Sequence, residues 1–361
     1  MAEGFALLIA VVVLSVVFDY INGFHDTANA IATVVSTGVL PPRTAILIAA
    51  IFNFAGAFLG TGVAQTIGGG IADPESITQT VVVCALCGAI VWNLITWYFG
   101  IPSSSSHALV GGIVGAVLCH RVLEEHAGFM PSLTTLASSE GVVKVVKFLI
   151  ISPLVGFVGG FAIMVVLLWI VRRMSPTRVN RSFRHLQLAS AGFMALSHGS
   201  NDAQKAMGIV TMGLVSYYGT HAAHAPGWLN LQAWQASHKL FIPYWVIVAC
   251  ASAMALGTAA GGWRIMKTMG HKIIKLKPIH GFAAETAGSI VILTATYFFH
   301  APVSTTHVIS SSIMGVGASK RVSAVRWGLA GNIMTAWVLT IPVSALVAAL
   351  LYLVLRPIVG G

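Results

Sequence analysis

Apolar residues follow one another along this chain in long runs that short polar stretches separate. Most runs approach the about 20 apolar residues that a helix needs to cross a bilayer. None of the polar stretches is long enough to form a soluble domain, so the pattern predicts an all-α integral membrane protein with about ten transmembrane segments. These segments are expected at 5–37, 43–66, 78–99, 101–119, 142–171, 187–216, 241–263, 281–299, 301–319 and 324–355.

Composition agrees with a membrane protein. Of the 361 residues, 57% are hydrophobic and 8% are charged, against about 25% charged in soluble domains. This balance excludes a soluble enzyme, a secreted disulfide scaffold, a disordered chain and a nucleic-acid-binding domain, in spite of a net charge of +10. The four cysteines lie in or beside apolar runs and are interpreted as packing residues. They are Cys84, Cys87, Cys119 and Cys250.

Basic residues gather in three of the polar stretches, at 172–184, 264–277 and 320–326. The positive-inside bias assigns all three to the cytoplasm. Ten crossings satisfy this condition and then place both termini outside, together with the acidic linker that holds Asp73 and Glu75.

Two motifs occur twice, in the same order in each half of the chain. Gly23–Ala30 (GFHDTANA) resembles Gly199–Ala206 (GSNDAQKA), and Pro102–His107 (PSSSSH) resembles Pro302–His307 (PVSTTH). Five crossings per half is an odd number, so the halves take opposite orientations. This is the inverted-repeat architecture of secondary transporters, whose substrate sites lie where broken helices of both halves meet. Repeat one is expected at about 1–171 and repeat two at about 187–361, joined by the basic cytoplasmic linker 172–186.

The first motif pair places an acid, Asp26 or Asp202, inside an apolar segment. Such a group must face protein, water or an ion. A structural role at a helix break is one reading, but the recurrence of the motif favours a cation or proton site. Gly23 and Gly199 are expected to allow local unwinding there. Asn29 is a further candidate ligand, and His25 beside Asp26 is a candidate for proton coupling.

The second motif pair combines a proline with hydroxyls at the start of an apolar run. Helix N-termini with nearby hydroxyl donors bind anions, and the two copies together predict an anion site; the alternative is that the hydroxyls only cap helices or join neighbouring helices. The candidate residues are Ser104, Ser105, Ser106, Ser304, Thr305 and Thr306.

Two further charged residues lie in apolar segments. Lys205 stands where Asn29 stands in the first motif copy, and it either extends to an interface or supplies a fixed positive charge near the anion. Glu285 is either a proton or cation relay or a partner for a basic residue.

These duplicated motifs resemble those of the inorganic phosphate transporter (PiT) family, in its bacterial low-affinity permease type, and the resemblance covers nearly the whole chain. It implies an inverted-repeat carrier that moves orthophosphate with a cation, as a homodimer, with the possibility of a small cytoplasmic accessory protein. It also implies that the Ser/Thr segments are hairpin-like, which leaves open whether 78–119 and 281–319 cross the bilayer or re-enter it. Matched to this chain, the family's phosphate and cation residues are Asp26, Asn29, Ser104, Ser105, Ser106, Asn201, Asp202, Ser304, Thr305 and Thr306.

This chain departs from the family pattern at two positions. His25 stands where many members have Asn, and Lys205 where sodium-coupled members repeat Asn. Both changes introduce a group that holds a proton or positive charge, which favours proton coupling over sodium, with phosphate also able to move as a neutral divalent-metal complex. Short loops favour a bacterial inner membrane. No resident cofactor is expected.

Three other functions are alternatives to phosphate symport. Sulfate transport by the same fold is the first, and a passive anion channel is the second, although buried acids disfavour a channel. A membrane-embedded hydrolase is the third, but the sequence contains no His-Glu-x-x-His, Gly-x-Ser-x-Gly or Walker-type motif.

Overall fold

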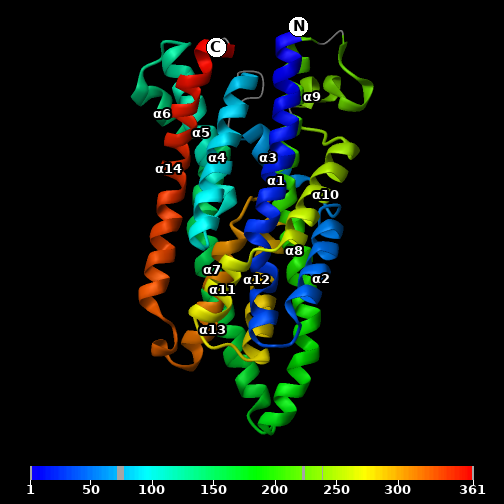
Figure 1. Ribbon diagram of the computed structural model, residues 1–361, viewed down its shortest axis with the longest axis vertical. Coiled ribbons are helices and arrows are strands. Elements are labelled where there is room, and N and C mark those ends of the chain that lie inside the picture. The colour runs from blue at the N-terminus through cyan, green and yellow to red at the C-terminus, as the bar shows by residue number, and fades with distance from the viewer. Residues whose placement is uncertain (1, 71–76, 222–223, 238, 360–361) are drawn as a thin grey trace.

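The computed structural model describes residues 2–70, 77–221, 224–237 and 239–359, in which every regular element is helical (Figure 1). Asp73 and Glu75 of the acidic linker lie outside these residues. The first half of the chain contains α1 (Ala2–Ser36), α2 (Pro42–Gly56), α3 (Gly62–Gly70), α4 (Gln79–Phe99), α5 (Ser105–Leu123), α6 (Phe129–Ala137) and α7 (Glu140–Val171).

The second half begins with a helix of 45 residues that includes most of the expected basic linker, so only 172–175 separate it from α7. Its helices are α8 (Pro176–Thr220), α9 (Leu231–Ser237), α10 (Tyr244–Ala260), α11 (Trp263–Lys267), α12 (Pro278–Tyr297), α13 (Thr305–Lys320) and α14 (Trp327–Val359). Single helical turns connect some of these helices, namely η2 (Gly227–Leu229), η3 (Thr268–Lys272) and η4 (Val322–Ala324).

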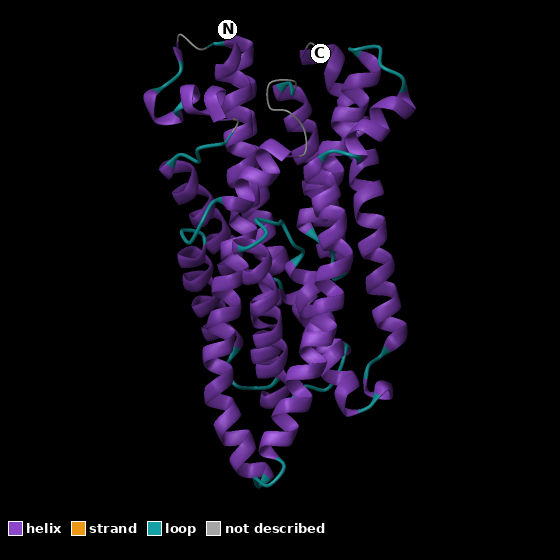
Figure 2. Ribbon diagram, turned by 180° about the vertical axis from the view of Figure 1, so that it is seen from behind, coloured by secondary structure: helices purple, strands orange, loops and turns teal. Residues whose placement is uncertain are grey.

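The chain termini and the basic clusters lie at opposite ends of the molecule. Both chain termini lie at one end in both ribbon views (Figures 1 and 2). The turn between α7 and α8 lies at the opposite end, where Lys277, Lys320 and Pro176 line one cavity. There the Arg326 amide donates to the Ile273 carbonyl, 3.2 Å away. The three basic clusters therefore share one end, as predicted.

Five helices have the length and composition of membrane spans, namely α1, α4, α5, α7 and α14. The α10 and α11 pair qualifies as a sixth span that is bent by 58°. Although α8 is too polar for this criterion, it extends from the basic end toward the end with the termini (Figure 1). The polar residues between Gln187 and Thr211 are buried rather than exposed to lipid, and they include His198, Asp202 and Lys205.

Of the two arrangements left open for 78–119 and 281–319, the structure has hairpins rather than simple crossings. The hairpin α4–α5 occupies the half of the molecule with the termini, and α12–α13 occupies the opposite half (Figure 1). Their tips meet between these halves, where the Ser106 hydroxyl donates to the Val303 carbonyl at 3.1 Å. Each half of the chain thus contributes one hairpin, in opposite orientations, to an inverted repeat.

The two halves interlock. The last helix of each half packs on the hairpin of the other, α7 on α12 and α13, and α14 on α4 and α5. The first helix of each half likewise packs on a later helix of the other half, α1 on α10 and α8 on α2. Many apolar side chains of α7 and α14 remain exposed, as expected for helices that face lipid.

Local sequence explains where the hairpins turn. Gly100 ends α4 in the left-handed conformation with a φ of 65°, which costs glycine little. Pro102 and Pro302 then precede Ser104 and Ser304, whose side chains cap α5 and α13.

The expectation that Gly23 and Gly199 unwind their helices is wrong. Helices α1 and α8 continue through both glycines. A Cβ on Gly23 would lie 2.4 Å from the Met254 carbonyl oxygen, and one on Gly199 would lie 2.2 Å from that of Asn53. These glycines therefore allow α10 and α2 to approach closely. The breaks lie elsewhere, between α2 and α3, between α10 and α11, and at the hairpin tips.

Candidate functional site

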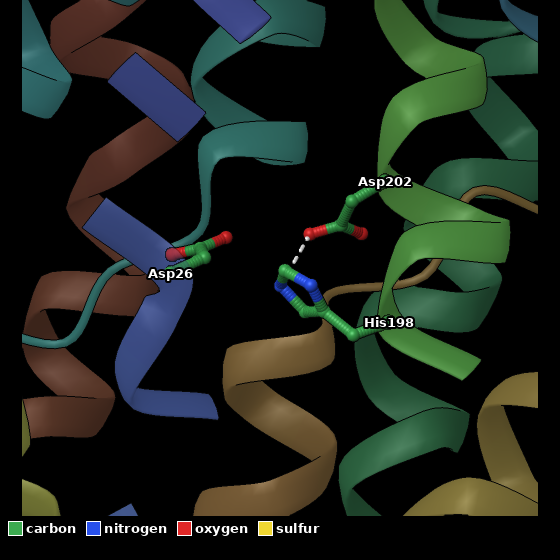
Figure 3. A group of neighbouring side chains, drawn as sticks. All are labelled: Asp26, His198 and Asp202. Carbon is green, nitrogen blue, oxygen red and sulfur yellow. Dashed lines mark ion pairs between the residues drawn. The ribbon is translucent and has the colours of Figure 1, made fainter. Parts of the chain in front are cut away.

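The two motif acids face each other across the interface of α1 and α8. Figure 3 shows Asp26 on α1 pointing toward Asp202 and His198 on α8. One ligand atom from each of these three residues lies within 4.8 Å of the others. All three side chains are buried. The two copies of the motif, which match in sequence, therefore also place their acids side by side in the structure (Figure 3).

Each acid contacts a hydroxyl at the tip of its own half's hairpin. The Ser105 hydroxyl lies 2.9 Å from Asp26 Oδ2 and 2.6 Å from Asn22 Oδ1. In the second half, the Thr305 hydroxyl donates to Asp202 Oδ2 at 3.1 Å. Since Ser105 and Thr305 occupy matching motif positions, the halves form the same contact twice.

The residue before each acid is also bound in a matching way. His25 Nδ1 lies 2.7 Å from Asp26 Oδ1, and its Nε2 lies 3.0 Å from the Thr96 hydroxyl. In the second half, the Asn201 amide donates to the Thr296 hydroxyl at 2.8 Å. Sequence reasoning missed Thr96 and Thr296, because one hydroxyl in an apolar helix is an ordinary feature; their matching distances before Pro102 and Pro302 were the available signal.

Other contacts join the two halves directly. The Asn29 amide on α1 donates to the hydroxyls of Thr305 at 3.1 Å and Thr306 at 2.9 Å. The Thr306 hydroxyl also lies 3.4 Å from Asp26 Oδ1. Both helices and both hairpin tips therefore enclose a single site.

The remaining motif hydroxyls act within or between the tips. Ser104 and Ser304 accept hydrogen bonds from the backbone N–H groups of His107 and His307, each at 3.2 Å. Ser104 and Ser304 therefore cap α5 and α13, whose N-termini lie at the site. The rings of His107 and His307 pack on each other with centroids 4.8 Å apart.

Lys205 is fully buried, so it does not extend to an interface. Its ammonium pairs with Asp202 and also lies 3.3 Å from the Val303 carbonyl oxygen at the second tip. His198 Nε2 lies 3.1 Å from Asp202 on the other side, and its Nδ1 lies 3.2 Å from Asn53 Oδ1. Lys205 therefore lies among the predicted site residues rather than at an interface.

Glu285 lies outside this group. Its buried carboxylate accepts hydrogen bonds from Thr33 at 2.5 Å, from Gln187 at 3.0 Å and from Ser190. It has no basic partner among the described residues. The structure thus places Glu285 beside neutral donors, on the side of the site toward the C-terminal end of α1.

The site is closed on all sides. The predicted site residues are at most 2% exposed. A ligand could therefore reach these residues only if the helices or hairpins moved.

Comparison with known proteins identifies the family. The model of the phosphate transporter family matches residues 22–178 and 171–348. This chain belongs to the phosphate transporter family. Two bacterial relatives, each named a probable low-affinity inorganic phosphate transporter, are 47% identical to it. The Rhizobium meliloti (strain 1021) protein matches 97% of this chain and 96% of its own length, and the Bacillus subtilis (strain 168) protein matches 98% of each.

Solved structures add a fold comparison for this phosphate transporter family member. A structure described as the sodium-dependent phosphate transporter superposes with a TM-score of 0.75 and covers 98% of this chain and 100% of its own. At 23% identity this likeness establishes the fold alone. The family is one of transporters rather than enzymes, which excludes the hydrolase considered from the sequence.

Proposed function

We propose that the protein is a secondary active transporter that imports inorganic phosphate together with protons by alternating access. The observation that carries this proposal is the convergence of Asp26 and Asp202 with hydroxyls from both hairpin tips at one closed site. Hydroxyl and helix N-terminal N–H donors suit a tetrahedral oxyanion. The phosphate-binding residues in this proposal are Asp26, Asn29, Ser104, Ser105, Ser106, Asn201, Asp202, Lys205, Ser304, Thr305 and Thr306.

The two acids favour phosphate over sulfate. Hydrogen phosphate carries a proton that it donates to a carboxylate such as Asp26, whereas sulfate at neutral pH has none. A sulfate ion beside Asp26 and Asp202 would leave anionic oxygens facing each other in a buried site, where such repulsion is strong. Sulfate transport therefore remains the weaker alternative.

The contacts of the acids favour proton coupling over sodium coupling. His25 lies against Asp26, while Lys205 and His198 lie against Asp202. These nitrogen groups occupy positions around the carboxylates where a sodium ion needs oxygen ligands. We assign the coupling role to His25, Asp26, Asn29, Asp202 and Glu285.

A divalent metal moving with phosphate is the second candidate, and one observation favours it. Asp26, His198 and Asp202 together offer two carboxylate oxygens and one imidazole nitrogen within 4.8 Å. Such a set accommodates the metal of a neutral metal–phosphate complex without a dedicated metal site.

We further propose that the basic end faces the cytoplasm of a bacterial inner membrane, so that both termini lie outside. In this proposal the two repeats move against each other, so that the site opens first to one side of the membrane and then to the other. The repeats are 1–171 and 187–361, joined through 172–186. The homodimer and the accessory protein rest on the family resemblance and stay predictions.

Reconstitution in liposomes tests the proposal. Radiolabelled phosphate uptake is measured under an inward proton gradient, then a sodium gradient, with unlabelled sulfate and added Mg²⁺ in parallel samples. We expect a proton gradient to drive accumulation and sulfate not to compete. Sodium-driven uptake without a response to pH would overturn proton coupling, and uptake of sulfate alone would overturn the substrate.

A further inference from the structure

One buried acid takes no part in the site described above. Asp19 lies on α1 and is fully buried. Neither of its carboxylate oxygens has a hydrogen-bond partner among the described residues. The Asn22 amide lies near Asp19 and donates to the Met254 sulfur, 3.9 Å away. An ionised carboxylate without partners is strongly disfavoured in a protein interior, whereas its protonated form is tolerated.

Asp19 belongs to a polar stripe along α1. Alternating spacings of four and three residues place polar side chains on one helical face, and all of them are at most 2% exposed. The stripe consists of Ser15, Asp19, Asn22, Asp26, Asn29 and Thr33. It extends from the half of α1 near the chain termini, through the central site, to Thr33, which donates to Glu285 at 2.5 Å.

The repeat architecture does not account for this stripe. In α8, aligned through Asp26 and Asp202, the apolar residue Ala195 stands where Asp19 stands in α1. Ala191 likewise replaces Ser15. An acid at this depth is therefore a feature of one half only. Keeping it there opposes the stability of the fold, which points to a role in transport.

The charged surroundings of Asp19 connect it to the central site. The ionisable groups that act on it electrostatically are Asp202 and Lys205 of α8, together with the buried thiol of Cys250 on α10. Lys205 is already paired with Asp202. Asp19 therefore has no cation of its own, and a proton is the one cation that neutralises it without oxygen ligands.

We propose that Asp19 is a proton-binding site of the transporter, which takes up the coupling proton on the side of the chain termini and releases it when the carrier changes state. Its carboxylate gains one proton on an Oδ atom and later releases the same proton, so no other reactant is needed. This inference rests on the proposed phosphate–proton symport and adds to it a carboxyl outside the phosphate site.

The decisive variant is Asp19→Asn, which copies the protonated carboxyl in shape but cannot release a proton. Two measurements are made in liposomes that contain purified protein. Exchange of labelled for unlabelled phosphate without a gradient reports binding and movement of the carrier, and accumulation under an inward pH gradient reports coupling. We expect exchange within about twofold of wild type and a loss of at least about tenfold in gradient-driven accumulation.

The control variant is Asp19→Glu, which keeps a titratable carboxyl and is expected to retain both activities with a shifted pH profile. If Asp19→Asn accumulates phosphate like wild type under the pH gradient, the proposal is wrong. If wild type responds to sodium and not to pH, and Asp19→Asn loses that response, Asp19 is a sodium ligand instead. Failure of exchange in wild type would contradict the proposed function itself.

A second readout does not depend on transport. Infrared difference spectra of wild type across a pH titration are expected to contain the carbonyl band of a protonated buried carboxyl that Asp19→Asn lacks. An unchanged set of carboxyl bands in the variant would show that Asp19 does not bind a proton, even if that variant were poorly folded in liposomes.

Discussion

Removal of the charge on Lys205 tests the electrostatic account of the site. Lys205 and Asp202 form an ion pair in which both side chains are fully buried. Breaking one side of a buried pair costs about 3–5 kcal/mol, since the remaining charge keeps its desolvation penalty. Lys205→Met keeps an unbranched side chain that is only one atom shorter, so the lost charge accounts for most of the effect. At about 2 °C per kcal/mol for a large domain, the apparent Tm should fall by roughly 6–10 °C.

The double variant Lys205→Met with Asp202→Asn makes this prediction specific. It removes both charges, so most of the lost stability should return, and a double-mutant cycle gives the coupling directly. Thermal unfolding of the purified protein in detergent is followed for wild type, both single variants and the double variant. Lys147→Met is the matched control, because Lys147 is exposed and should shift the Tm by little. A double variant as unstable as the sum of the singles would refute the reasoning.

Four further variants test local features. Gly23→Ala would place its Cβ 2.4 Å from the Met254 carbonyl oxygen, so we expect the yield of folded protein in detergent to collapse; normal folding would contradict the close approach of α10. Gly100→Ala, at a φ of 65°, should cost about 1–2 kcal/mol in thermal unfolding, and an unchanged Tm would contradict it. Ser104→Ala should cost about 1 kcal/mol of stability as a lost cap and also weaken phosphate binding. Ser105→Ala, which removes no cap, should weaken phosphate binding in a competition assay with little loss of stability; a Ser105→Ala variant that is less stable than Ser104→Ala would contradict these roles.

Much of the site was predictable because its motifs occur twice in the sequence. The matching positions of Asp26 and Asp202, and of Ser105 and Thr305, indicated one site before any coordinates, and the structure brings these four side chains together. The membrane class followed from apolar runs, and the shared end of the basic clusters followed from charge alone. These properties depend on residue type and order, which the sequence states directly.

The hairpins were not predictable from length. Helix α4 has 21 residues and α5 has 19, and both are long and apolar enough to cross a bilayer. What distinguishes a hairpin from two crossings is the contact between the tips, such as Ser106 with Val303. That contact joins residues nearly two hundred positions apart, and no local pattern contains it.

The role of Gly23 was mistaken for a related reason. Glycine permits both an unwound helix and a close helix crossing, and the flanking sequence is equally compatible with the two. The choice depends on Met254 and its neighbours in α10, which approach to within a distance that excludes a side chain. Tertiary packing therefore decided between two local options that the sequence leaves equal.

The asymmetries between the repeats indicate where coupling resides. If the halves were identical, opening to either side would present the same site, and a cation gradient could not favour one state over the other through differential binding. The chain breaks this symmetry with ionisable groups. When the repeats are aligned, each of these groups corresponds to a residue that is not ionisable in the other half. The pairs are His25 with Asn201, Lys205 with Asn29, Asp19 with Ala195, and Glu285 with Ala85.

Three of these groups contact or lie near the polar stripe of α1. His25 touches Asp26, Glu285 binds Thr33, and Asp19 belongs to the stripe itself. By contrast, the contacts that suit phosphate, from Ser105 and Thr305, are the same in both halves. In the proposed phosphate–proton symport, symmetric residues thus suit the substrate, which must bind in both states. Asymmetric ionisable residues suit the proposed coupling proton, whose binding must differ between the two states for the gradient to do work.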